Sequence, residues 1–206
     1  MSEILNTDTF RQKFKEGTRQ NRFKVHFDLI KDLPFLDAMK EDVADSMYFV
    51  TATNLPGQNI GEVSVNFAGR ELKYAGNPEA GEWTCTFIND VMFKAHKMIE
   101  SWMTATFDQK TQYHGVSAGY HRDLFISQLD NNGNIIATIL MHNAYPKSLA
   151  EMAKSQETAD FDTFDVGFNY DYRLITYGPD SLETIQEAAN SAALQIPSIV
   201  NDLPTV

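Results

Sequence analysis

The stretch of residues 46–105, SMYFVTATNLPGQNIGEVSVNFAGRELKYAGNPEAGEWTCTFINDVMFKAHKMIESWMTA, decides the fold. Its apolar residues first alternate with polar residues and then recur at intervals of three and four. Alternation places every second side chain on one face of a strand, whereas intervals of three and four describe one face of a helix. The stretch therefore predicts a strand, a long hairpin, a strand and a helix, in that order. It contains no pattern typical of a catalytic site.

A long hairpin is predicted over residues 60–75, after a strand over 46–54. Its two alternating runs are separated by Ala68-Gly69, and glycine accepts a positive φ without steric cost, so the turn is expected there. The apolar residues of the two runs are Val63, Val65, Phe67, Leu72 and Tyr74. Residues 76–81, GNPEAG, contain two glycines and a proline and are expected to form a loop.

A strand over residues 82–88 and a helix over 90–105 are expected after this loop. One face of the strand carries Trp83, Cys85 and Phe87. From Val91 onward the apolar spacing is helical, and Asn89 or Asp90 is the expected N-cap because its side chain can accept a free backbone N–H. We expect this helix to cover one edge or face of the sheet.

Regular structure is also predicted on both sides of the central stretch. The expected elements are a helix over 7–18, strands over 22–29, 122–129, 135–143 and 163–174, and a helix over 181–195. Residues 31–45, 106–121 and 145–160 are polar and are expected to be loops or short helical turns. Because strands follow one another without alternating with helices, the sequence predicts a mainly β chain with flanking helices, whose antiparallel strands form a sandwich or barrel.

The composition favours a folded domain without enzymatic chemistry. The 206 residues suit one domain, at most with appendages, and 14 Phe and 8 Tyr can fill its core. A net charge of −11 argues against a protein that grips nucleic acid, because such proteins gain affinity from basic patches that release counterions. The lone Cys85 has no partner for an intrachain disulfide. No signal peptide, membrane-spanning segment or cofactor is expected, so the protein is expected to be soluble in a reducing compartment.

One short motif permits a hydrolase reading. Gly115-Val116-Ser117-Ala118-Gly119 matches the G-x-S-x-G pattern, with His142 and Asp130 as candidate partners of Ser117. In a hydrolase that serine needs a sharp turn between a strand and a helix. Here the motif follows a helix and a polar loop and precedes a strand. A flexible loop is therefore the favoured interpretation, and a Ser hydrolase is the less favoured one.

Two further groups of residues have possible ligand types but favour ordinary explanations. The loop Asp130-Asn131-Asn132-Gly133-Asn134 resembles a calcium loop only in composition, because its glycine is fourth instead of sixth and Met141 stands at position twelve. Asn-Gly between apolar runs favours a hairpin turn instead. His114 and His121 flank the Ser117 loop, but they lack the spacing of a metal-binding motif. No metal site is therefore expected.

Several pieces of sequence stand in a fixed order along the chain. They are Asn21-Arg22-Phe23-Lys24-Val25, Ala52-Thr53-Asn54-Leu55-Pro56-Gly57, Val65-Asn66-Phe67-Ala68-Gly69-Arg70, Tyr74-Ala75-Gly76 and Trp83-Thr84-Cys85-Thr86-Phe87-Ile88-Asn89-Asp90. In this order they resemble the tail tube protein of contractile-tailed bacteriophages. That family is similar in fold to the tubes of R-type bacteriocins and type VI secretion. The resemblance covers roughly residues 8–175.

The resemblance implies a structural virion protein. Its β-sandwich or barrel subunits would close into homo-hexameric rings with a continuous inner β-barrel, and the rings would stack into the tail tube that conducts DNA during ejection. The implied partners are the tail sheath outside, the tape measure protein and DNA in the lumen, and the baseplate and tail terminator at the ends. The implied location is the virion tail, assembled in the host cytoplasm. A baseplate tube initiator and a secretion-tube homologue are the alternatives.

The resemblance also divides the chain and assigns candidate residues. Residues 1–176 would form the tube domain and 177–206 a C-terminal helical or extended appendage. The candidate lumen-facing residues are Glu62, Asp165 and Asp171, each on the polar side of an expected strand. The candidate residues for stacking between rings are Leu55, Pro56, Gly57, Phe67, Gly69 and Arg70.

Overall fold

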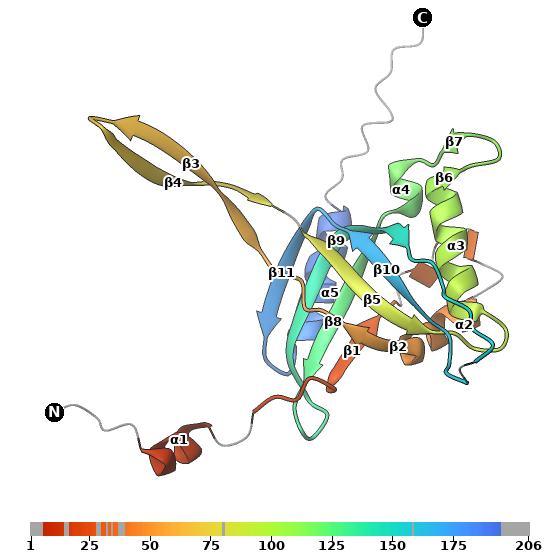
Figure 1. Cartoon of the computed structure of the whole chain (residues 1–206), viewed down its shortest axis with the longest axis horizontal. Helices are drawn as coiled ribbons and strands as arrows, with labels where there is room; N and C mark the ends of the chain where they lie inside the picture. The colour runs from red at the N-terminus through yellow and green to blue at the C-terminus, as the bar shows by residue number, and fades with distance from the viewer. Residues whose placement is uncertain are drawn as a thin grey trace, which may run out of the picture.

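Strands contain more residues of the described chain than helices do in the computed structural model (Figure 1). The model describes residues 6–14, 17–27, 30–31, 33, 35–36, 40–79, 81–157 and 159–194. The strands are β1 Phe23–His26, β2 Val50–Thr53, β3 Asn59–Phe67, β4 Arg70–Glu79, β5 Glu82–Ile88, β6 Phe107–Asp108, β7 Tyr113–His114, β8 Arg122–Leu129, β9 Ile135–Leu149, β10 Thr163–Asn169 and β11 Tyr172–Tyr177. The helices are α1 Thr7–Phe14, α2 Lys40–Asp45, the 3-10 helix η3 Ser46–Phe49, α3 Lys94–Thr106, α4 Ser117–Tyr120 and α5 Ser181–Leu194.

Seven of the strands form one antiparallel sheet. Its order is β1-β8-β9-β10-β5-β2, and β11 pairs with β9 beside this path. Strand β9 joins two parts of the sheet. Its residues 135–144 pair with β8 on one edge, and residues 137–142 also pair with β11 on the other edge. Its last residues, Tyr145 to Leu149, pair with β10. Asn143, with a φ of 53°, lies between the two parts. The mainly β, antiparallel prediction is thus confirmed, while closure into a ring and barrel stays a prediction.

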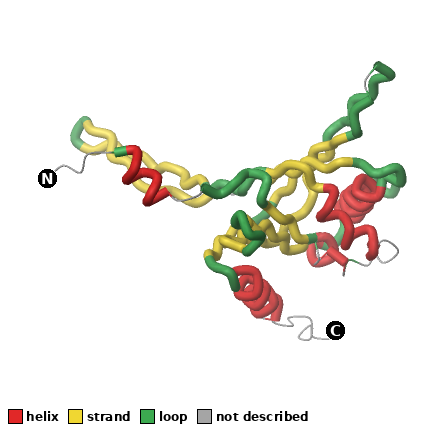
Figure 2. Tube along the Cα trace, turned by 90° about the horizontal axis from the view of Figure 1, so that it is seen from below, coloured by secondary structure: helices red, strands yellow, loops and turns green. Residues whose placement is uncertain are grey.

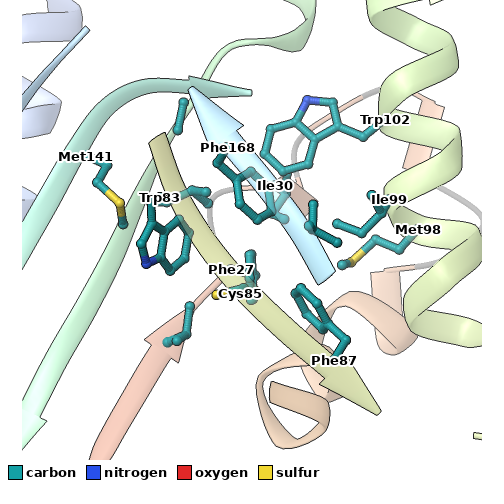
Figure 3. Packing of buried hydrophobic residues seen from close by; sticks show 14 of the residues in the cluster. Phe27, Ile30, Trp83, Cys85, Phe87, Met98, Ile99, Trp102, Met141 and Phe168 are labelled. Atoms are coloured by element: carbon teal, nitrogen blue, oxygen red, sulfur yellow. The ribbon is translucent and has the colours of Figure 1, made fainter. Parts of the chain in front are cut away.

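The main core lies between this sheet and α3. The predicted apolar face of β5 is confirmed, because Trp83, Cys85 and Phe87 are all buried. Phe168 of β10 packs at the centre, with its ring centroid 5.1 Å from that of Trp83 and 6.0 Å from that of Trp102 on α3 (Figure 3). Helix α3 therefore covers a face of the sheet, as its apolar spacing predicted.

Helix α5 packs on the opposite face of β8 and β9. Its Ile185 contacts Phe125 and Leu140, which alternate with the residues that enter the main core. Figure 2 shows α5 apart from the other helices of the body, on its own side of the strands. The proposed boundary at residue 177 stays a prediction, but the first turns of α5 are packed onto the sheet.

A line of buried polar side chains runs beneath α5. His26 Nε2 lies 3.3 Å from Ser127 Oγ, which lies 3.1 Å from Thr138 Oγ1, and Thr138 Oγ1 lies 2.9 Å from Ser181 Oγ. Both faces of β1 are covered at this point, because the neighbouring Val25 and His26 are both buried. The imidazole is buried because the hydroxyl groups around it supply hydrogen bonds that water would otherwise supply.

Two predicted loops are strand in the structure. Strand β4 continues to Glu79, and β9 continues through Pro146 to Leu149. These strand segments contain Pro78 and Pro146, and each proline stands next to a shift in register where the ladder is already interrupted. Proline is tolerated at such bulges because its missing N–H breaks no regular hydrogen bond there.

Three other boundaries also differ from expectation. The single strand predicted over 163–174 is two strands, β10 and β11, separated by Tyr170-Asp171. Residues 106–121, predicted as loop, include β6, β7 and α4. The polar stretch 31–45 contributes buried apolar side chains. Those described are Leu33, Leu36 and Val43.

The start of α3 is displaced from the predicted position. Val91 is 96% exposed and precedes the helix, which begins at Lys94. The prediction of Asn89 or Asp90 as N-cap was wrong, because Phe93 is the N-cap, but Asp90 Oδ1 still accepts the backbone N–H of Lys94, the first helical residue, at 2.7 Å. No helix within the described residues combines the length and apolar character needed to cross a membrane.

The buried thiol of Cys85 gives a first testable prediction. Burial raises the pKa of Cys85 to about 12, although a hydrogen bond to Thr53 opposes the rise. A thiol-specific chromogenic reagent is therefore expected to leave the folded protein unmodified and to modify one thiol per chain after unfolding in guanidinium. Because the pKa is higher in the folded state, this group's contribution to stability is complete below pH 9.0 and is lost as the pH rises toward about 12. Rapid modification of the folded protein at neutral pH would contradict the buried position.

Candidate functional site: an exposed hairpin and a polar sheet face

The β3–β4 hairpin projects from the body of the molecule (Figures 1 and 2). Its strands pair with each other from Asn59 and Glu79 to Phe67 and Arg70, and form a sheet of two strands. The predicted turn is confirmed: Ala68 and Gly69 have φ values of 49° and 75°. Two successive residues with positive φ form the type of tight turn whose twist suits a hairpin.

One face of this hairpin is apolar and exposed. Cross-strand pairing places Val63 opposite Tyr74 and Val65 opposite Leu72, on the same side as Phe67. These five side chains are all exposed, and Phe67 reaches 72%. The opposite face is polar and includes an ion pair of 2.7 Å between Lys73 Nζ and Glu62 Oε1. An apolar surface of this kind on a projecting ribbon is typical of a protein–protein contact.

A second candidate surface is the face of β5 and β10 that points away from the core. Glu82, Thr84 and Thr86 alternate with the buried residues of β5, and Thr86 donates a hydrogen bond of 2.6 Å to Asp165 on β10. Glu82 accepts from Lys147 at 2.9 Å and from Ser148 at 3.2 Å. The polar sheet face consists of Glu82, Thr84, Thr86, Lys147, Ser148, Asp165, Gly167 and Asn169.

Electrostatics and a glycine shape this polar sheet face. The hydrogen bond from Lys147 is the main cause of a lowered pKa at Glu82, so this carboxylate is charged at neutral pH. A Cβ at Gly167 would collide with the side-chain oxygens of Glu82 and Ser148. The glycine therefore leaves room for the Glu82 side chain to lie flat across β10.

The three candidate lumen residues lie in three different places. Glu62 is on the polar face of the hairpin, and Asp165 is on the polar sheet face. Asp171 lies in the turn between β10 and β11, where its Oδ2 accepts a hydrogen bond of 2.7 Å from the Asn143 amide. The expectation that Asp165 and Asp171 share one strand face was wrong, because the chain turns between them to pair with a different part of β9.

The stacking candidates fall into two groups. Leu55, Pro56 and Gly57 lie in the link between β2 and β3, and the ring of Pro56 is buried. Phe67, Gly69 and Arg70 lie at the tip of the hairpin. Of the two groups, only the one at the hairpin tip lies at the end of the exposed apolar face.

Sequence reasoning missed most of the polar sheet face. The alternation that placed Trp83 in the core also places Glu82, Thr84 and Thr86 outward, so this part of the signal was present. Lys147 and Ser148 were missed because the polar stretch 145–160 was expected to be a loop or a short helical turn. Their place beside β10 depends on strand pairing, which no local pattern reports.

The three residues of the less favoured hydrolase reading have separate hydrogen-bond partners in the structure. Ser117 Oγ lies 2.6 Å from His121 Nδ1, within the same helical turn. His142 Nδ1 instead lies 2.9 Å from Asp123 Oδ1. Burial lowers the pKa of His121, with Asp171 opposing and His142 adding to the fall. The side-chain hydrogen bonds of Ser117, His142 and Asp130 thus go to other residues, and Ser117 is exposed at the surface.

The Asp130 loop is a hairpin turn, as favoured. Asp130 Oδ1 accepts the backbone N–H groups of Asn132 and Asn134 at 2.7 and 2.9 Å, and Gly133 has a φ of 89°. The Asp130 carboxylate therefore accepts its hydrogen bonds from groups of its own loop. His114 packs against Phe107 at 4.6 Å between ring centroids, whereas His121 packs against Tyr120 and Tyr145. The described residues contain no cluster of three metal-ligating side chains.

Comparison with known proteins matches this architecture to one family. A family profile described as "Phage tail tube protein" matches residues 18–176. The tail tube protein of Serratia phage KSP90 is 27% identical over 163 residues, which cover 76% of this chain and 89% of the relative. Tail tube protein gp19 of Enterobacteria phage T4 is 23% identical over 124 residues, which cover 59% of this chain and 76% of the relative.

Solved structures share the fold at lower identity. The tube terminating cap of the anti-feeding prophage has a TM-score of 0.57 at 16% identity, covering 79% of this chain and 93% of that chain. A chain of the sheath–tube complex of an extracellular contractile injection system, PVC, has a TM-score of 0.52 at 13% identity, covering 84% and 99%. The resemblance drawn from the sequence pieces is confirmed by the family profile and the phage relatives. The chain therefore belongs to the family of phage tail tube proteins, which are structural components of the virion tail.

Proposed function

We propose that this chain forms homo-hexameric rings that stack into the inner tube of a contractile phage tail and conduct DNA into the host during ejection. The tail sheath surrounds this tube, the tape measure protein and DNA occupy its lumen, and the baseplate and tail terminator hold its ends. Assembly takes place in the host cytoplasm. Family membership supports the tube role, and the number of subunits and the partners are part of the proposal.

The observation that carries the proposal is the exposed apolar face of the β3–β4 hairpin. Val63, Val65 and Phe67 are exposed on a ribbon that projects from the rest of the described chain. Burying each such side chain contributes about 1.5–3 kcal/mol, so a second copy that covered them would be held firmly. A chain with a net charge of −11 needs such an apolar contact, because identical acidic surfaces repel each other.

Free strand edges favour closure of copies into a ring. In the described chain β1, β2 and β11 each pair with one neighbour only. Unpaired N–H and C=O groups along such edges are templates for pairing with another chain. A contact between two different surfaces that repeats around an axis closes into a ring, and a repeat along the axis gives a tube.

The polar sheet face is the proposed wall of the lumen. It presents hydroxyl, amide and carboxylate groups, and its lysine, Lys147, forms an ion pair with Glu82. Such a wall has no free basic patch, so it lacks the counterion-release term that holds DNA on a protein surface. DNA is therefore expected to slide past it. Asp165 is the candidate lumen residue that lies on this face.

Electron microscopy of the purified chain tests the proposal. We expect six-fold rings or tubes about 80–100 Å wide, because about twenty-four strands spaced about 4.8 Å apart and tilted by about 40° form the inner barrel, and an outer layer about 10 Å away with its exposed side chains adds to each side. A monomer at every concentration, with no tubes in extracts of infected cells, would overturn it. A baseplate tube initiator or a secretion-tube homologue is the alternative, supported by the fold that this chain shares with a chain of the anti-feeding prophage baseplate. Copies per virion separate these roles, because a tube protein is present in many more copies than an initiator.

Charge reversal of the candidate lumen residues gives a second prediction. Replacing Glu62, Asp165 and Asp171 together by lysine is expected to leave rings intact and to slow DNA ejection. Each new cation facing the lumen adds a phosphate contact, so the delay is expected to shrink as salt is raised. Ejection is followed in single virions by DNA fluorescence.

The matched control carries the same change of charge elsewhere. The control replaces three exposed loop residues after β9 by lysine: Glu151, Glu157 and Asp160. Normal ejection at low salt in the first variant, or equal slowing in both, would contradict a lumen role. A tube structure with Glu62, Asp165 and Asp171 all on the outer wall would do the same.

A further inference from the structure

Helix α5 is anchored to the sheet by its first turns. The chain leaves β11 through Gly178, whose φ of 117° is open to glycine and lets the backbone turn back over the strands. Ser181 is buried, with its Oγ 2.9 Å from Thr138 Oγ1, and Ile185 is buried against β8 and β9. Figure 2 shows the helix lying on one side of these strands. The start of α5 is therefore a fixed part of the subunit surface.

The two parts of the sheet place α5 and the polar sheet face on opposite sides of the subunit. Ile126 of β8 and Met141 of β9 enter the same core as Phe168 of β10. Their neighbours Phe125 and Leu140 point the other way, toward α5, because successive side chains of a strand point to opposite faces. The order across the subunit is therefore the polar sheet face, β5 with β10, the core, β8 with β9, and α5.

We propose that α5 forms the outer wall of the tube and is the surface of this chain that contacts the tail sheath. The inference rests on the proposed function, because a polar sheet face that lines the lumen leaves α5 at the far, outer end of this order. The matched family profile ends at residue 176, and α5 spans Ser181–Leu194. The contact is therefore assigned to an element outside the matched range.

The exposed side of α5 sets the chemistry of its partner. Glu183 and Glu187 are exposed and stand four residues apart, so they lie on the same side of the helix. Residues 177–206 contain four acidic side chains, Asp180, Glu183, Glu187 and Asp202, and no Lys or Arg. A sheath surface that presents Lys or Arg fits such a wall, because complementary charges favour the correct partner and its register. A second tube would instead be repelled, since its wall carries the same charges.

The helix also adds to the width of the tube. An α-helix with its side chains is about 10–12 Å thick, and copies of α5 stand on both sides of the tube axis. They widen the outer wall by about 20 Å and leave the lumen unchanged. A sheath must match this outer width, so α5 acts on which sheath the tube accepts through size as well as charge.

Labelling of assembled tubes tests the position of α5. Two full-length variants each replace one exposed carboxylate by cysteine: Glu183→Cys on α5 and Asp165→Cys on the polar sheet face. The reagent is a maleimide attached to a protein too large to enter the lumen. We expect Glu183→Cys to react equally fast in tubes and in unassembled subunits, and Asp165→Cys to react at least about tenfold more slowly in tubes. The native Cys85 is buried and adds no competing site.

Co-assembly with the sheath protein of the same phage tests the partner. In sheathed tubes, labelling of Glu183→Cys by a small maleimide is expected to be at least about tenfold slower than in bare tubes. The full-length double variant Glu183→Lys with Glu187→Lys is expected to form bare tubes normally and to bind at least about tenfold less sheath, because the reversed charges repeat in every subunit. The matched control, Glu151→Lys with Glu157→Lys on the loop after β9, is expected to keep its sheath.

The possible outcomes separate the outer wall from the tube role. Bare tubes that protect Glu183→Cys, sheathed tubes that leave it fully reactive, or equal loss of sheath in both charge variants would each overturn the assignment of α5. A reconstruction of unmodified tubes with α5 in the lumen or between rings would do the same, and it needs no variant. All these results leave the tube role standing, whereas failure of the unmodified chain to form rings or tubes would overturn the proposed function.

Discussion

Replacing Phe168 by alanine is expected to lower the free energy of unfolding by about 3–5 kcal/mol, which is a large part of the stability of a single domain. Phe168 is fully buried, and its ring meets Trp83, Trp102 and Phe27 at centroid distances of 5.1, 6.0 and 6.4 Å. These residues come from β5, α3 and the segment after β1. Alanine would leave a cavity where the sheet meets the helix, and rigid neighbours on three sides cannot close it. Chemical denaturation followed by tryptophan fluorescence measures the loss.

The control for this substitution is another phenylalanine in the same part of the chain. Phe161 is 81% exposed, so Phe161→Ala is expected to change stability by less than about 0.5 kcal/mol. Equal losses in the two variants would show that the ring of Phe168 is not the centre of the core. A normal unfolding midpoint for Phe168→Ala would do the same.

Removing the apolar face of the hairpin is expected to abolish tubes while the subunit stays folded. We would replace Val65, Phe67 and Leu72 by serine. At about 1.5 kcal/mol or more for each buried side chain, the concentration needed for assembly rises at least about a thousandfold, since 1.4 kcal/mol corresponds to a factor of ten. Deleting residues 58–74 is expected to have the same result. Sedimentation and electron microscopy report assembly, and circular dichroism reports folding.

The opposite face of the same hairpin supplies the control. Asn66, Glu71 and Lys73 alternate with the apolar residues and are replaced by serine in the matched variant. This variant is expected to keep most of its tube formation, because no large apolar area is lost. Long tubes from the apolar-face variant would refute the role of the hairpin, and equal loss in both variants would point to strand pairing as its main contribution.

Elements defined by neighbouring residues could be predicted from the sequence. The turn at Ala68-Gly69 follows from the local backbone, because two residues with positive φ favour a glycine. The buried face of β5 follows from its alternation, because successive side chains of a strand point to opposite faces. The sequence pieces around these elements were also sufficient to indicate the family. The candidate stacking residues at the hairpin tip come from the same local pattern.

Features that depend on strand pairing were decided only by the tertiary structure. The break between β10 and β11 exists because each strand pairs with a different part of β9. Lys147 reaches Glu82 because β9 and β5 both pair with β10, and His26 is buried where β8, β9 and α5 bring Ser127, Thr138 and Ser181 together. The physical reason is the same in each case. Contacts between residues far apart in the chain fix which side of an element is covered, and a local sequence pattern contains no information about the partner.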